Sequence, residues 1–160
     1  MADKKNVFIS HVHDDDKLLP KLKDLISKAG MEVSDGSINS EKPNMAKSED
    51  YIKQKILAPR IQWASTLVVL ITRDTADSWW VNWEIDQAVA QGKNVVGVFA
   101  QGATTADIPE ALGKCGDAVI VGWHGERIVA AIKGEIQEWD DPETGEPRNR
   151  EWIVKRITCR

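Results

Sequence analysis

The residues with the clearest chemical potential lie in one short stretch, residues 78–85, which read SWWVNWEI. Three of the seven tryptophans of the chain fall inside it, and Glu84 directly follows the last of them. A buried tryptophan needs a partner for its indole N–H, and a carboxylate beside such rings loses water, so its contacts become consequential. The stretch predicts either a site that acts on a flat or sugar-like group, or a heavily packed helix with a surface glutamate.

Helical geometry divides this stretch into faces, because successive residues of an α-helix are about 100° apart. Trp80 and Glu84, four residues apart, lie one above the other. They flank an apolar side that we expect to face a sheet, so Glu84 is expected at the edge of the core, where a cleft could reach it. The apolar side consists of Val81, Ile85, Ala88 and Gly92.

Trp79 and Trp83 fall nearly opposite that apolar side. Outward-facing rings are unusual for a monomer and indicate a contact surface for a partner. The alternative is that the C-terminal segment, which carries Trp139 and Trp152, folds back over them.

Short apolar runs alternate with helical patterns along the chain. Strands are predicted over residues 6–10, 31–34, 66–72, 94–99 and 118–122, and helices over about 17–29, 48–57, 79–91, 108–112 and 126–136. The run 66–72 is apolar on both faces, which suits the centre of a parallel sheet covered by helices. The alternation predicts an α/β fold with a doubly wound, parallel, five-stranded sheet.

Composition bounds the class of protein. The 160 residues, 42% hydrophobic and 29% charged, suit one globular domain. A net charge of −4 without a dense basic stripe argues against nucleic acid as the main partner. No apolar run approaches the ~20 residues of a membrane span, and we expect a soluble, cytoplasmic protein with reduced thiols. Residues 1–137 are expected to form the domain, and residues 138–160 a C-terminal extension packed on or beside it, with a small added strand over 151–158.

The predicted topology indicates where a ligand binds. In open parallel sheets, ligands bind beyond the carboxyl ends of the strands, at the switch point of the strand order. The loop over residues 35–44 follows the second strand, and the tryptophan stretch follows the third. The candidate binding residues are Phe8, Ser10, His11, Asp35, Ser37 and Trp80.

Several of these segments together resemble a TIR domain. They are residues 7–10 (VFIS), the Ser/Asn-rich loop after the second strand, residues 67–72, residues 80–85 (WVNWEI), and Gly92 with Lys93. More narrowly, the chain resembles the bacterial TIR-like proteins of Thoeris anti-phage defence systems. The resemblance covers residues 4–137, and its most specific element is Phe-Ile-Ser together with Trp-x-x-Trp-Glu. It implies a flavodoxin-like, TIR-like fold.

The resemblance also implies an activity. In that family the glutamate of this helix cleaves the nicotinamide–ribose bond of NAD, so the catalytic role falls on Glu84, with NAD as substrate rather than cofactor. Residues of the first strand line the nucleotide pocket, which points to Phe8 and Ser10 and to His11 after them. The product would be an ADP-ribose-derived signalling nucleotide, cyclic or conjugated, read by a downstream effector.

The loop after the second strand departs from the family pattern. It lacks the common Arg-Asp start and Pro-Gly tip, which puts the assembly mode in doubt. The main alternative function is a non-enzymatic interaction module that self-associates through Trp79, Trp83 or the loop over residues 35–44.

Two other classes are weighed on their motifs. His11, His13 and the aspartates after them resemble part of a metallo-hydrolase signature, but Asp16 stands where a third histidine is needed, so no metal site is predicted. The acidic run 14–16 also resembles a phosphoacceptor response regulator. That class needs an aspartate ending the third strand and a lysine after the fifth, and neither is present, so the run is interpreted as a helix cap.

Overall fold

The computed structural model describes residues 3–12, 17–35, 58–114, 118–136, 138–142 and 147–148. The strands are β1 (Asp3–Ser10), β2 (Met31–Asp35), β3 (Thr66–Ile71), β4 (Asn94–Phe99), β5 (Val119–Val121), β6 (Trp139–Asp140) and β7 (Pro147–Arg148). The helices are α1 (Leu19–Lys28), α4 (Ala58–Trp63), α5 (Trp79–Ala90), α6 (Glu110–Lys114) and α7 (Gly125–Ile132), with a 3-10 turn η3 (Thr105–Asp107).

The main sheet has five parallel strands in the order β2-β1-β3-β4-β5. The order reverses between β1 and β3, so the switch point lies where these two strands end. In the register, Ser10 at the end of β1 pairs with Val69 of β3. The predicted α/β class with a doubly wound, parallel, five-stranded sheet is confirmed.

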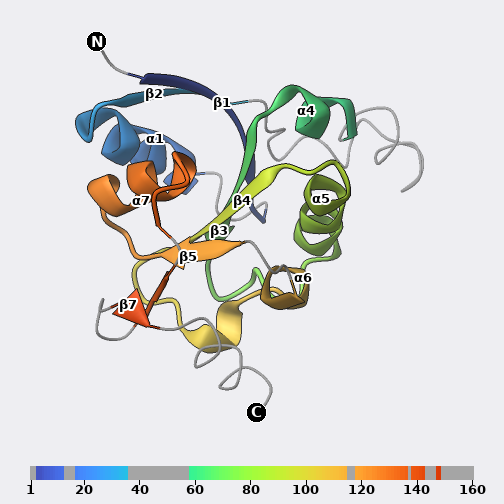
Figure 1. Ribbon diagram of the computed structural model, residues 1–160. Coiled ribbons are helices and arrows are strands. Elements are labelled where there is room, and N and C mark those ends of the chain that lie inside the picture. The colour runs from blue at the N-terminus through green and yellow to red at the C-terminus, as the bar shows by residue number, and fades with distance from the viewer. Residues whose placement is uncertain are drawn as a thin grey trace.

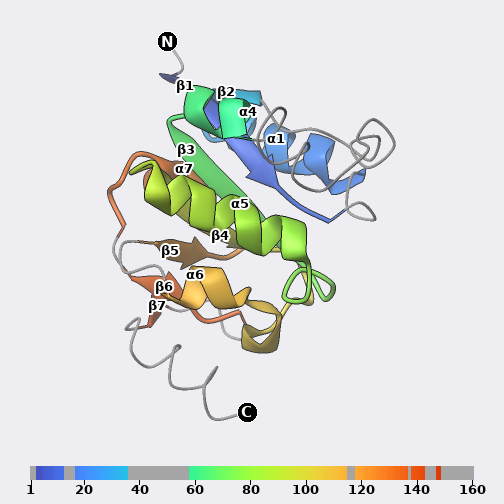
Figure 2. The same ribbon diagram turned by 90° about the vertical axis from the view of Figure 1, so that its right-hand side faces the viewer.

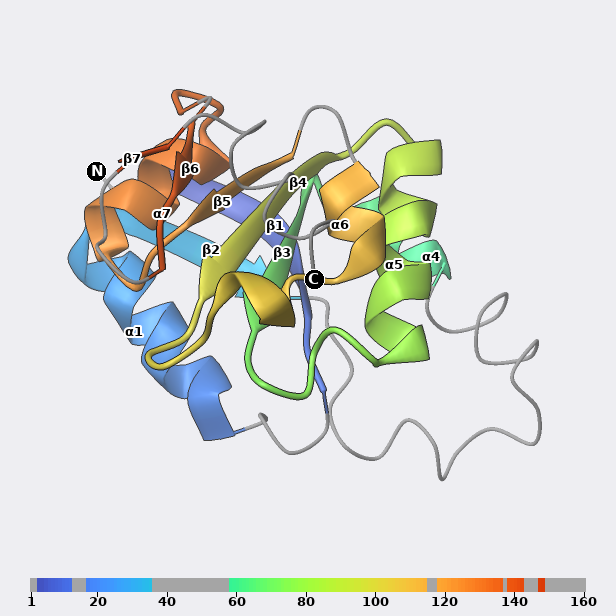
Figure 3. The ribbon, with the colours of Figure 1, turned by 90° about the horizontal axis from the view of Figure 1, so that it is seen from below.

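Helices cover both faces of this sheet (Figures 1 and 3). Helices α1 and α7 pack together on one face, and α5 lies on the other between α4 and α6. Every residue of β3 is buried, as expected for a central strand between two helical layers. Figure 2 shows α5 lying across the sheet, so its inner side faces the central strands.

Local signals explain where α5 begins and ends. Its N-cap is Ser78, whose hydroxyl accepts from the Val81 N–H at 3.3 Å, and this satisfies an amide that the first helical turn leaves unpaired. After the helix, Gly92 adopts a φ of 72°, a left-handed conformation that glycine takes at little cost. These bounds agree with the predicted helix to within a residue.

A small hairpin, β6–β7, lies beside β5 at the edge of the sheet (Figure 2). Trp139 of β6 is fully buried, and its indole Nε1 donates to the Ala118 carbonyl at 2.7 Å. The predicted strand over residues 151–158 and the predicted helix over 48–57 lie outside the described residues.

A buried carboxylate next to Trp139 also ties this hairpin to the domain. Asp140 accepts from both Nε and Nη2 of Arg127 and from the Gly122 N–H, the last at 2.9 Å. The hydrogen bond from Asp140 raises the pKa of the Arg127 guanidinium above its ordinary value, so the cation is retained. Residues 139 and 140 are therefore part of the folded core.

We expect Trp139→Ala to lower the free energy of unfolding by about 3–5 kcal/mol, because a large buried side chain is removed and the Ala118 carbonyl loses its donor. The matched control is Trp79→Ala, at a ring with 42% of its surface exposed, for which we expect a loss of about 1 kcal/mol or less. Urea unfolding followed by circular dichroism measures both. Equal losses would contradict the packing described for Trp139.

Candidate active site

A short hydrogen bond joins the first strand to the tryptophan helix. Ser10 Oγ, at the end of β1, donates to Glu84 Oε1 on α5 at 2.7 Å, although the two residues are 74 positions apart. Both side chains have 0% of their surface exposed. A carboxylate without water needs such donors, because burying a charge is otherwise costly. Two of the predicted site residues are thus brought into direct contact.

Asn82 holds the beginning of α5 in place. Its Nδ2 donates to the Ala76 and Ser78 carbonyls at 3.1 and 3.0 Å, and its Oδ1 accepts from the Ala111 N–H at 3.0 Å. One side chain therefore links the loop before α5, the helix itself and α6. Asn82 was not among the predicted site residues, because an amide between tryptophans has no signal in the sequence that distinguishes it from a surface residue.

Glu84 lies inside the core, and the expectation that it sits at the core edge is wrong. The buried residues of α5 are Val81, Glu84, Ile85 and Ala88. Helix α5 contacts β1, β3 and β4, so the sheet extends beyond the width of the helix. Because β1 carries Ser10 beneath the flank of α5, the side chain of Glu84 is covered as well.

The exposure of the three tryptophans of α5 differs from the expectation that Trp79 and Trp83 both point outward. Trp79 is 42% exposed and stacks on Trp80, with ring centroids 4.3 Å apart and planes 24° from parallel. Trp83 is half-buried and packs against the core, so its predicted outward position is wrong. The reason is that α4 and α6 also pack against α5 and cover more than one side of it.

The other predicted residues are distributed around the ends of β1 and β2. Phe8 is fully buried and lies two positions before Ser10, on the same face of β1. His11 follows β1 and is nearly buried, with its Nδ1 3.0 Å from the Ile9 carbonyl oxygen. Asp35 ends β2, opposite Val7 in the register, and Ser37 lies outside the described residues.

Among the described residues, no group of three or more His, Cys, Asp or Glu side chains could hold a metal ion. His13 and the acidic run 14–16 lie outside that set. None of the described helices has the length and apolar character needed to cross a membrane.

Comparison with known proteins adds a family. A search of curated proteins gave no match. Among solved structures, one titled a CMP N-glycosidase, BcmB, from Clostridium botulinum is 18% identical with a TM-score of 0.48, and the match covers 77% of this chain and 92% of that chain. The family model of the Thoeris protein ThsB, TIR-like domain, matches residues 8–105. That span is more than half of the 160 residues and contains both Ser10 and Glu84. The chain therefore belongs to the Thoeris ThsB TIR-like domain family.

Proposed function

We propose that this protein cleaves the nicotinamide–ribose bond of NAD, with Glu84 as the catalytic residue, and makes an ADP-ribose-derived signalling nucleotide in bacterial anti-phage defence. The observation that carries the proposal is the buried 2.7 Å hydrogen bond between Ser10 and Glu84. Both residues lie within the span that matches the family model. NAD is then a substrate rather than a resident cofactor, and a downstream effector responds to the product.

The reaction needs little beyond one well-placed carboxylate. When the bond between the ribose and the pyridinium nitrogen breaks, its electron pair moves to that nitrogen, and nicotinamide leaves as a neutral molecule. The positive charge left on the ribose is like that of the oxocarbenium-like transition state in glycoside cleavage. Glu84 would stabilise this charge, or hold the ribose hydroxyls, without a metal ion.

The nucleophile that captures the ribose decides the product. Water gives ADP-ribose and releases a proton, a nucleophile within the same nucleotide gives a cyclic isomer, and an external nucleophile gives a conjugate. A signalling role in this proposal favours the cyclic or the conjugated product, and mass spectrometry of the nucleotide made from NAD distinguishes all three.

The proposal requires an opening movement, because Glu84 has no exposed surface. Trp80, one helical turn before Glu84, is only half-buried and stacks on the exposed ring of Trp79. We place substrate entry beside Trp80, with the flat nicotinamide ring stacked against it. The remaining proposed substrate contacts belong to the ends of β1 and β2 and the loop that follows, namely Phe8, Ser10, His11, Asp35 and Ser37.

We expect Glu84→Gln to reduce nicotinamide release from NAD by about a hundredfold or more, because an amide carries no charge to stabilise the ribose cation. The fold is expected to persist, since the amide oxygen can still accept from Ser10 Oγ. The measurement is nicotinamide release by liquid chromatography, with the protein's circular dichroism spectrum as a check on folding.

The matched control for this substitution is Asp86→Asn, at an exposed position on the same helix. It removes the same charge and is expected to leave the rate unchanged. If folded Glu84→Gln consumes NAD at the wild-type rate, the catalytic role of Glu84 is overturned.

We expect Ser10→Ala to lower kcat by about tenfold, because Ser10 positions Glu84 through one hydrogen bond to a charged group, with a smaller rise in KM from its own proposed contact with the substrate. The control is Ser65→Ala, which removes an exposed hydroxyl that donates to the Asn6 carbonyl at 3.1 Å. A change confined to KM would show instead that Ser10 contributes to ground-state binding and not to the placement of Glu84.

A protein-interaction module that acts by self-association is the second candidate function. The exposed ring of Trp79 favours it, and Trp83 and the loop over residues 35–44 were the other predicted contacts. The two candidates differ in one measurement, because an interaction module releases no nicotinamide from NAD.

A further inference from the structure

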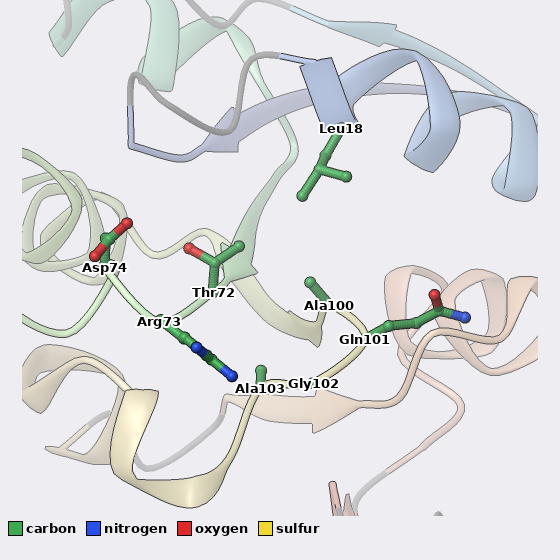
Figure 4. Close-up of a pocket in the computed structure, with 8 residues that line it drawn as sticks. All are labelled: Leu18, Thr72, Arg73, Asp74, Ala100, Gln101, Gly102 and Ala103. Carbon is green, nitrogen blue, oxygen red and sulfur yellow. The ribbon is translucent and has the colours of Figure 1, made fainter.

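A separate pocket lies at the carboxyl edge of the sheet (Figure 4). It has a volume of about 350 Å³ and is lined by Leu18 before α1, by residues 72–74 after β3 and by residues 100–103 after β4. Neither Ser10 nor Glu84 lines it. This edge is where open parallel sheets bind their ligands, and the volume lies within the usual range for small-molecule sites.

Arg73 supplies the positive charge of this pocket. Figure 4 shows its guanidinium extending toward Gly102 and Ala103, with the carboxylate of Asp74 pointing away from it. The Arg73 side chain is exposed. Within the part of the chain that the structure describes, it makes no hydrogen bond or ion pair. The guanidinium is therefore available to an anionic ligand.

A buried hydroxyl holds the backbone around Arg73 through hydrogen bonds. Thr75 is fully buried; its Oγ1 accepts from the Thr72 N–H at 2.8 Å and donates to the Leu70 carbonyl at 3.1 Å. The Thr75 N–H donates in turn to the Thr72 carbonyl at 3.2 Å. Because this turn is already ordered, ligand binding has to immobilise only the Arg73 side chain.

A tight turn forms the opposite wall. The Ala103 N–H donates to the Ala100 carbonyl at 3.1 Å, and Gly102 adopts a φ of 87°, which suits the third position of a type II turn. Among the described residues, no backbone hydrogen bond uses the N–H of Gln101 or Gly102. Both residues line the pocket, so it offers peptide donors as well as a cation.

We propose that this pocket binds a phosphate group of a nucleotide, with Arg73 as its main ligand. The planar fork of arginine matches phosphate oxygens, and hydrogen bonds between ionised groups are the strong ones. The volume suits a phosphate with its sugar rather than a whole dinucleotide. The phosphate has two sources, the diphosphate of NAD itself or a second nucleotide; the first source rests on the proposed function.

The register of β1 and β3 is compatible with the first source, the diphosphate of NAD. Ser10 is level with Val69, and Thr72 lies three residues further along, about 10 Å at the rise of a β-strand. The pocket includes Leu18, just before α1, whereas Glu84 lies on α5, on the opposite face of the sheet. A ligand that reaches both Glu84 and the pocket therefore passes over the end of the sheet. An extended dinucleotide has the length and flexibility to do so.

The first test uses inorganic pyrophosphate and isothermal titration calorimetry, with amide NMR shifts at Gln101 and Gly102 to locate the site. We expect wild-type protein to bind pyrophosphate, and Arg73→Gln to weaken binding by about tenfold or more. Arg60→Gln, which removes an exposed arginine of α4, should leave binding unchanged. Equal pyrophosphate binding by wild type and Arg73→Gln, or no binding by wild type, overturns the proposal.

A kinetic comparison then identifies the source. If the pocket holds the diphosphate of NAD, Arg73→Gln raises KM for NAD, but not for nicotinamide riboside, which has no phosphate. If it holds a second nucleotide, KM for NAD stays the same while ADP-ribose binding weakens. If Arg73→Gln loses pyrophosphate binding but the wild-type protein does not cleave NAD, the phosphate pocket is supported and the proposed function is wrong. Failure of the pocket proposal and failure of the proposed function are therefore distinguishable.

Discussion

The contact between Ser10 and Glu84 sets the position of α5, and much of the molecule depends on where α5 lies. The hydrogen bond is 2.7 Å long and ties the helix to the end of β1, beside the apolar packing of Val81, Ile85 and Ala88. Asn82 then carries that position to the preceding loop and to α6 through three further hydrogen bonds. One strand end, one loop and two helices are thus held together, and of the three tryptophans of α5 only Trp79 is exposed.

The sequence was sufficient for the five strands of the sheet and for α1, α5, α6 and α7. It was not sufficient for α4 (Ala58–Trp63), because Pro59 was interpreted as the end of a helix over 48–57. Residues 67–71 are apolar without interruption, and the glycine at position 92 ends a helix that begins at a serine cap, so β3 and α5 could be placed to within a residue. These features arise from local chemistry and periodicity, which a sequence displays directly. The alternation of strands and helices predicted a doubly wound sheet, and the structure gives its strand order.

The site could be predicted in its members but not in its arrangement. Glu84 and Ser10 were both candidates, yet their contact depends on how α5 crosses β1. The spacing of residues along one helix gives no information on that crossing. The same limit explains Trp83, whose cover comes from neighbouring helices, and the pocket beside Arg73, which is assembled from three loops. The β6–β7 hairpin was missed because two-residue strands leave no periodic pattern, although Trp139 anchors it firmly.

The burial of Glu84 has a consequence for the balance between stability and activity. Its neighbours on the inner side of α5 are Val81, Ile85 and Ala88, and a leucine among them would satisfy the packing without a charge to desolvate. Apart from the contact with Ser10 Oγ, the packing gives no advantage to a carboxylate at this position. Proteins depart from their most stable sequence mainly at sites that act on something else, which is consistent with the catalytic role proposed for Glu84.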